Sequence, residues 1–244
     1  MNKKNFVLVL SFILLIYPDG FCSQKDSFIG MGVMYQQSPY TKVDSKIYPV
    51  PIISLEYKRF FIDQTLFGFH LIDTNKFKFS FINSVRLAGY NSDDSPNLNG
   101  MQDRKSTLEA GLRVKWNSNP FTFTITGLTD LLDKHEGQQI SVFILKEFFE
   151  RFLTLHIGIS WFSDNLVNYY YGVKDSEVTS QRSVYQPDDT VNYITGLTFA
   201  VPLGRHWTLI NDIQYELLGE EIKYSPLVDK NGISRFIFGI VYRF

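Results

Sequence analysis

The side chains that could carry out chemistry are few and widely spread along the sequence. The four histidines are His70, His135, His156 and His206. No two of them stand three or four residues apart, a spacing that would place two metal ligands on one face of a helix. We therefore predict no metal site, and nothing in the sequence indicates a cofactor site.

One histidine stands near a possible nucleophile, because His156 is followed by Ser160 on the same face of a candidate strand. Four residues of a strand separate two side chains by roughly 13 Å, too far for a nucleophile and its base. A serine and a histidine on neighbouring strands remain an open alternative. The sequence predicts that the chain has no catalytic residues and is not an enzyme, with an enzyme kept as the minor alternative.

Two further groups of residues are candidates for binding. Asp130, Asp133 and Glu136 surround His135 and form either a solvated surface turn or a cation site. The surface turn is the favoured interpretation, because charged residues in a turn are usually exposed. The tyrosines 169–171 form either a binding patch or an aromatic segment packed against the rim of a membrane protein.

The elements that must position these residues are strands, because apolar residues recur with a period of two. Between Leu108 and Trp116 every second residue is apolar, and charged residues or glycine stand between them. Successive side chains of a strand point to opposite faces, so this pattern gives one apolar and one polar face. Similar alternation is found in the ranges 76–91, 121–130, 137–148, 152–163, 190–202, 205–218 and 233–244.

The length and composition of these strands favour a membrane barrel over a soluble β-sandwich. Many runs reach ten residues or more, as a tilted crossing of a membrane requires. Aromatic residues make up 16% of the chain and lie mostly on the apolar face, as in lipid-facing strands with aromatic girdles. In lipid, strands satisfy their backbone hydrogen bonds only in a closed barrel. A sandwich, the alternative, would place its apolar face inward.

The first residues have the layout of a secretory signal peptide. Lys3 and Lys4 precede an uncharged run, Phe6–Tyr17, and small residues follow before Ser23. The run is too short to cross a bilayer core of about 30 Å as a helix. We expect residues 1–22 to be a signal peptide, and residues 23–244 to be a barrel exported to the outer membrane of a Gram-negative cell.

The connections between the strands predict their number. Short connections fall at 117–120, 149–151 and 201–205, whereas 92–105, 164–189 and 219–232 are long. Outer-membrane barrels alternate short periplasmic turns with longer surface loops and have an even number of strands. With strands at 28–36, 49–57 and 66–72, an even total needs a short strand near 60–64. We therefore expect an all-β, antiparallel up-and-down barrel of about twelve strands, with ten as the alternative.

Charged residues on the inner face suggest what the lumen does. Glu109, Arg113 and Lys115 form one row, with Arg86 and Glu56 on other strands. These charges either give a small pore its ion selectivity or close the lumen by mutual salt bridges. The formal net charge of −1 gives no basic excess, so a nucleic-acid partner is not expected.

The chain resembles the MltA-interacting protein family, also called MipA/OmpV. The residues that carry the resemblance are Gly30–Val33, Pro39–Tyr40, Tyr48–Pro51, Leu108–Leu112, Asn168–Val173, Tyr224–Val228 and Gly239–Phe244. The resemblance implies an outer-membrane protein in contact with lipid. The protein that gives the family its name is a scaffold linking a murein (peptidoglycan) hydrolase to a murein synthase, so the resemblance implies such a role for this chain. Other members are adhesins or surface antigens, so a surface adhesin is the alternative role.

Overall fold

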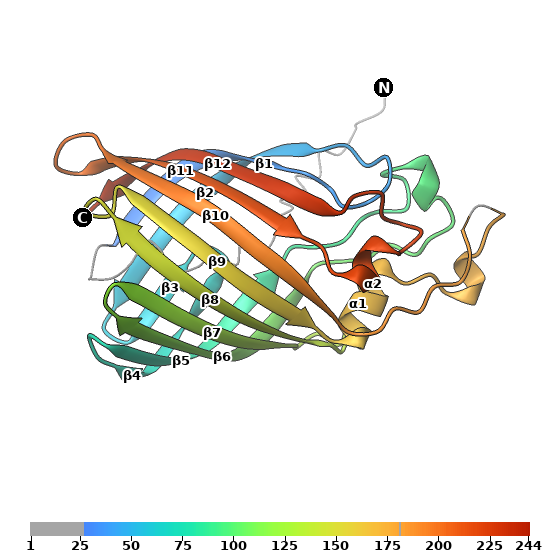
Figure 1. The fold of residues 1–244 in the computed structure, drawn as a ribbon, viewed down its shortest axis with the longest axis horizontal. Coiled ribbons are helices and arrows are strands. Elements are labelled where there is room, and N and C mark those ends of the chain that lie inside the picture. Colours follow the sequence, from blue (N-terminus) through green and yellow to red (C-terminus); the bar gives the residue numbers. More distant parts are fainter. Residues whose placement is uncertain (1–26, 181) are drawn as a thin grey trace, which may run out of the picture.

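The chain forms one closed β-barrel of twelve strands (Figure 1). The computed structural model describes residues 27–180 and 182–244. Each strand pairs with its neighbour in the sequence, and the first strand pairs with the last, so the described sheet closes on itself. All pairings are antiparallel. The predicted all-β, up-and-down barrel of twelve strands is therefore confirmed.

The strands differ little from those predicted. Their bounds are β1 (Phe28–Gln36), β2 (Lys46–Tyr57), β3 (Phe60–Asp63), β4 (Leu66–Asp73), β5 (Phe77–Arg86), β6 (Thr107–Ser118), β7 (Phe121–Asp130), β8 (Gln138–Phe148), β9 (Leu153–Phe162), β10 (Thr190–Pro202), β11 (Trp207–Leu217) and β12 (Gly232–Arg243). The short strand expected near 60–64 is β3. The largest difference is in β5, which ends five residues earlier than expected. Gly89, with a φ of 120°, turns the chain there so that Tyr90 pairs with Arg104.

The barrel has two unlike ends. The turn end carries Phe244 and the short connections 58–59, 74–76, 119–120, 149–152 and 203–206. The loop end carries the long connections 37–45, 87–106, 131–137, 163–189 apart from residue 181, and 218–231. These loops hold α1 (Asp164–Tyr171), α2 (Glu220–Lys223) and two short 3-10 helices, Pro96–Leu98 and Asp175–Glu177.

The outer face of the wall is apolar, as a bilayer requires. Side chains of alternate strand residues are exposed although they are large and hydrophobic, among them Met31, Phe81, Ile125, Ile157, Ile213 and Phe238. At the turn end, rings of Trp207, Tyr242 and Phe244 contact one another in edge-to-face pairs. Exposed apolar side chains with aromatic residues at the rim are the pattern of a transmembrane barrel.

The described residues contain no helix that is both long enough and apolar enough to span a membrane. The signal peptide expected at residues 1–22 lies outside the described residues.

The seam between β1 and β12 closes the barrel. Gly32 lies opposite Gly239, and a Cβ atom at Gly30 would stand only 2.1 Å from the carbonyl oxygen of Ile240. Glycine therefore allows the two backbones to pack closely here. The seam reaches the last residue, because the backbone N–H of Phe244 donates to the carbonyl oxygen of Ser27 over 3.1 Å.

We predict that deleting Phe244 lowers the amount of assembled barrel. The deletion removes the last bond of the seam and a ring that is 73% exposed at the turn end. The measurement is the fraction of outer-membrane protein that migrates differently before and after boiling. Phe244→Tyr is the matched control and should assemble normally, since it keeps an aromatic ring at the rim. Equal assembly of the deleted and full chains would contradict the role of the terminal residue.

Candidate functional site

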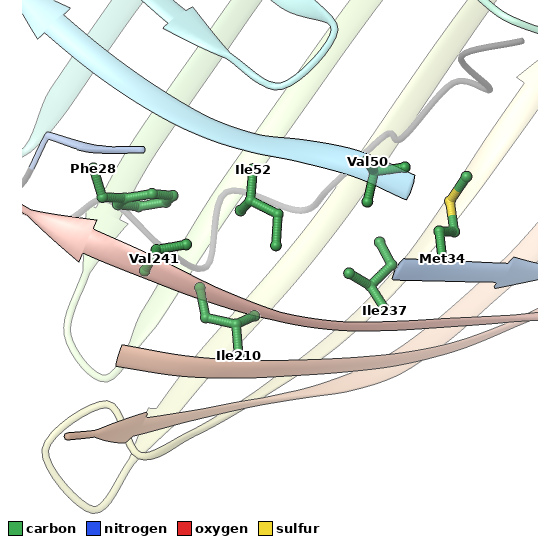
Figure 2. Close-up of a cluster of buried hydrophobic side chains, with 7 residues drawn as sticks. All are labelled: Phe28, Met34, Val50, Ile52, Ile210, Ile237 and Val241. Atoms are coloured by element: carbon green, nitrogen blue, oxygen red, sulfur yellow. The ribbon is translucent and has the colours of Figure 1, made fainter. Parts of the chain in front are cut away.

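The inside of the barrel has one apolar side. Seven buried side chains from four adjacent strands point inward there, as Figure 2 shows: Phe28, Met34, Val50, Ile52, Ile210, Ile237 and Val241. Their neighbours along the strands are the exposed, lipid-facing residues of β1, β2, β11 and β12. These strands are therefore apolar on both faces over part of their length. Charged residues of the inner face were predicted from the sequence, whereas this apolar side of the lumen was not.

The opposite side of the lumen is polar, and its charges form pairs. Arg86 Nε donates to Glu109 Oε1 over 2.7 Å, and both side chains are almost fully buried. His135 Nε2 lies 3.3 Å from the same oxygen, and Arg86 also donates to Gln139. An ion pair without access to water survives only with such additional hydrogen bonds.

The other predicted lumen charges are also on the inside. Lys78 Nζ donates to Glu56 Oε1 over 3.0 Å. Arg113 and Lys115 point inward on β6 with Glu109, and each is 8% exposed or less. The predicted row on β6 is therefore present. Because Arg86 and Glu56 are both paired, mutual salt bridges describe the polar side better than a row of free charges does.

The structure brings together a serine and a histidine that the sequence could not connect. Ser80 Oγ on β5 lies 2.8 Å from His70 Nδ1 on β4, and Glu56 Oε1 lies 3.8 Å from His70 Nε2. This resembles the order of a catalytic triad. Ser80 is only 2% exposed and the ring of Phe61 stacks on His70, so a substrate has little access to the hydroxyl. We interpret the group as part of the polar side of the lumen.

His156 and Ser160 are not brought together. Ser160 Oγ is paired with Ser141 Oγ at 2.8 Å. Neither ring nitrogen of His156 has a hydrogen-bond partner among the described residues. A Cβ atom at Gly196 would lie 2.3 Å from His156 Nε2, so glycine leaves the space that the imidazole fills.

The acidic loop around His135 is a structural turn. The carboxylate of Asp130 accepts hydrogen bonds from the backbone N–H groups of Leu132, Lys134, His135 and Glu136. Its oxygens are therefore used within the loop. No group of three or more potential metal ligands occurs in the residues that the structure describes. The favoured interpretation as a turn agrees with this arrangement.

A cavity of about 370 Å³ lies in the lumen near the loop end. Its floor is formed by the barrel wall and includes the polar Arg86 and Gln139 as well as the apolar Ile194. Its roof is formed by the loops, with Tyr40, Tyr90 and Arg104 among the lining residues. The volume falls in the range of about 300–1,000 Å³ that small-molecule sites occupy. This cavity is the best candidate for a binding site in the described chain.

The roof is a cap built from tyrosines. The rings of Tyr40 and Tyr90 meet edge to face at 4.7 Å, and Tyr40 Oη donates to the carbonyl oxygen of Tyr170 over 3.3 Å. Tyr169 Oη accepts from the backbone N–H of Lys105. Burial raises the pKa of Tyr90 to about 12. Of the two interpretations of residues 169–171, packing at the barrel rim is the one that this geometry favours.

A buried ion pair ties two loops of the cap together. Arg104 donates to both carboxylate oxygens of Glu177, at 3.0 and 3.1 Å, and Glu177 also accepts from the backbone N–H groups of Gln102 and Lys174. Arg182 donates to the carbonyl oxygens of Glu177 and Asn99. The sequence does not predict this network, because residues 104 and 177 lie in different loops and their pairing depends on the folded barrel.

We predict that Glu177→Gln loosens the cap at neutral pH. Burial opposes the charge on Glu177, but hydrogen bonds from Gln102, Lys174 and Arg104 outweigh it and hold the pKa of the carboxyl below its usual 4.5. Its contribution to stability is therefore present above pH 4.5 and is lost as the pH falls through the lower folded pKa. Breaking a buried pair costs about 3–5 kcal/mol.

The measurement is amide hydrogen exchange at residues 102 and 174. In the unmodified protein we expect these amides to lose protection only below pH 4.5, whereas Glu177→Gln should lose it already at pH 7. Asp175→Asn is the control, because that carboxylate is exposed beside the pair. Unchanged protection in Glu177→Gln would show that the pair does not hold the cap.

We predict that a fluorophosphonate probe does not label Ser80. The hydroxyl is buried, so its hydrogen bond to His70 does not make it an accessible nucleophile. The measurement is mass spectrometry of the folded protein in detergent after exposure to the probe. Ser80→Ala provides the baseline. Labelling that disappears in Ser80→Ala would contradict this prediction and support the barrel enzyme.

The comparisons with known proteins agree with the fold and with the resemblance. A family model described as MltA-interacting protein MipA matches residues 29–244. The chain is 30% identical to the "putative outer membrane protein YiaT" of Escherichia coli (strain K12), over 88% of this chain and 90% of that protein. It is 29% identical to the MltA-interacting protein of the same strain, over 88% and 89%.

Among solved structures, the NanC porin has a similar fold with a TM-score of 0.51. It is 9% identical in sequence and covers 89% of this chain and 100% of its own. An identity this low shows a common barrel architecture and nothing more. The match to nearly the whole described chain does show the family, and with the barrel it places the protein in the outer membrane. This chain is a member of the MltA-interacting protein (MipA) family of outer-membrane proteins.

Proposed function

We propose that the protein is a scaffold in the outer membrane that holds a murein hydrolase and a murein synthase at its turn end. In this proposal residues 1–22 direct export, residues 23–244 form the mature barrel, and the turn end faces the periplasm. The name of the MltA-interacting relative supports it. So does the general rule that short turns of such barrels are periplasmic.

One turn at this end carries the proposal. Phe149, Glu150 and Arg151 follow one another with φ values of 52°, 54° and 73°. A residue other than glycine costs about 1–2 kcal/mol in this left-handed conformation. Backbone strain persists only where the surrounding structure holds it, and it often marks a functional position.

The strained turn holds an aromatic side chain out of the barrel. The side chain of Phe149 is 76% exposed. The turn is fixed by a hydrogen bond from the N–H of Phe152 to the carbonyl oxygen of Phe149, and by an ion pair of 3.4 Å between Arg151 and Glu147. An exposed aromatic ring on a hydrogen-bonded turn is the kind of side chain that anchors a protein interface.

The other turns supply less surface. Turns 58–59 and 119–120 have two residues each, and the largest, 203–206, contributes the half-exposed Leu203. A stable interface usually buries about 1,200 Å² or more in total. Several turns must therefore act together around Phe149, and we expect the binding to be weak and reversible.

A surface adhesin is the second candidate, because the loop end presents exposed apolar side chains, among them Val178, Val184 and Tyr224. The tyrosines of residues 164–189 contribute less than the sequence suggested. Tyr170 is buried, and Tyr185 donates from its hydroxyl to Glu221.

We predict that Phe149→Ser weakens the capture of murein hydrolase more than tenfold. Removing an aromatic anchor from an interface costs about 2 kcal/mol or more, which corresponds to over a tenfold change in Kd. The measurement is a pull-down from periplasmic extract with the purified barrel as bait, read by hydrolase activity on murein. Val184→Ser, at the other end of the barrel, is the matched control and should bind normally.

Replacing residues 174–188 with a short Gly-Ser linker separates the two candidates. A scaffold that uses the turn end keeps its hydrolase, whereas an adhesin loses binding to its surface target. Loss of the hydrolase with the loop, while the barrel still shows heat-modifiable migration, would rule out the turn end as the contact surface.

A further inference from the structure

The barrel wall is shorter at β3 than at the other strands, because β3 ends early. Strand β3 has four residues, and its last pair with β2 joins Asp63 to Ser54. One further bond runs from the N–H of Gln64 to the carbonyl oxygen of Ile53. Beyond it, residues 46–52 of β2 pair with β1 on one side, and no strand of the described chain pairs with them on the other.

The end of β5 bounds this short part of the wall on the side opposite β2. Strand β4 begins at Leu66, opposite Ser84, and the N–H of Val85 donates to the carbonyl oxygen of Thr65. The chain then leaves the wall after Arg86. We call the gap in backbone pairing bounded by residues 46–52, the turn 64–65 and residues 85–87 the window.

The sequence of β2 is adapted to an open edge. The backbone of Ile53 faces the window side, so Pro51 and Pro49, at alternate positions, face the same side. Proline has no N–H group. Residues 49 and 51 therefore have no N–H group that would be left without a partner strand. Proline at an edge also prevents a second chain from adding a strand, so a second copy of this chain is not expected to pair here.

The window lies at the depth of the outer leaflet. Its outward-facing neighbours are apolar, and the side chains of Ile47 and Met31 are each 71% exposed. Tyr35, opposite Ile47, contacts the ring of Phe236 at 5.8 Å. Aromatic residues of this kind mark the edge of the apolar band. The window is thus in the half of the band nearest the loop end.

The cavity inside the lumen reaches both sides of the window. Lys46 and Tyr48 line it from β2, and Arg86 and Leu87 line it from the end of β5. Above the window, Lys46 Nζ lies 3.7 Å from a carboxylate oxygen of Asp94. The cavity therefore lies directly behind the stretch of wall where backbone pairing is missing.

Some residues that line the cavity carry buried polar atoms without a hydrogen-bond partner among the described residues. Tyr90 Oη and Arg104 Nε are buried and have no hydrogen-bond partner among the described residues. Buried donors are normally satisfied, so these two unsatisfied donors are candidate contacts for a ligand that carries an acceptor.

We propose that the window is a lateral passage for a single-chain amphiphile between the outer leaflet and the cavity. The apolar chain lies between β2 and β5, where the outward surface is apolar. The head group, which carries hydrogen-bond acceptors, contacts Tyr90 and Arg104. This role is independent of the scaffold at the turn end, and nothing in it requires the lumen to conduct ions.

The test uses quenching of tryptophan by brominated acyl chains. In a background in which Trp116, Trp161 and Trp207 are replaced by Phe, one indole is introduced by Tyr48→Trp at the window. Phe143→Trp places the control indole on the inner face of β8, where both neighbouring strands are complete. The probes are dibromostearate and dibromostearoyl lysophosphatidylcholine, added to the folded barrel in vesicles.

The expected result is saturable quenching at position 48 that exceeds quenching at position 143 at least twofold. The two probes differ in head group, so the tighter one shows whether a carboxylate or a phosphate is preferred. Equal quenching at both positions, or none at position 48, overturns the passage. If Tyr48→Trp fails to show heat-modifiable migration, Leu87→Trp samples the other edge of the window.

Tyr90→Phe tests the head-group contact separately. The hydroxyl has no partner in the described chain, so its removal should leave the cap intact and weaken the probe about fivefold, the effect of one hydrogen bond. An unchanged half-quenching concentration overturns the proposed contact. Quenching that never saturates shows lipid at the window without a binding site, which overturns the cavity as its destination.

Discussion

The constraint on which the structure depends is that every backbone N–H and C=O group within the bilayer must find a partner in the protein. A barrel satisfies this rule when its first and last strands pair, and here β1 and β12 pair along nine residues of β1. Close packing at Gly30 and Gly32 makes that seam possible. The window at β2 is the place where the rule is relaxed, and Pro49 and Pro51 reduce the number of donors left without a partner there.

The closure of the barrel also determines how the side chains in the lumen pack. A closed barrel of this size encloses side chains from twelve strands, and they divide into an apolar side and a polar side whose charges pair. Above them the loops form a cap tied by Arg104 and Glu177, so the loop end is largely occupied with its own packing. The turn end consists of short turns, and its strained turn presents Phe149 outward. The loop end is thus suited to enclosing the lumen, and the turn end is suited to contact with other proteins.

Much of the wall was predictable from the sequence, because alternation with a period of two is a local property. Strand β7 has the predicted bounds, 121–130, and the short β3 follows from the need for an even number of strands. The site was not predictable in the same way. The contact of His70 with Ser80 depends on the register of two strands, and that of Arg104 with Glu177 depends on two loops meeting above the barrel. Pro49 and Pro51 are visible in the sequence, but their meaning requires knowing which side of β2 has no partner.

The measurement that tests the closed barrel most directly is a cross-link through its seam. Val33 and Phe238 are direct partners and both face outward. Such partners lie about 4.5–5.5 Å apart between Cα atoms, within the range a disulfide spans. The double variant Val33→Cys with Phe238→Cys should form an intramolecular disulfide in the folded protein, and Val33→Cys with Tyr242→Cys, four residues out of register, should not. A disulfide in the second variant, or none in the first, would contradict the closure of β1 on β12.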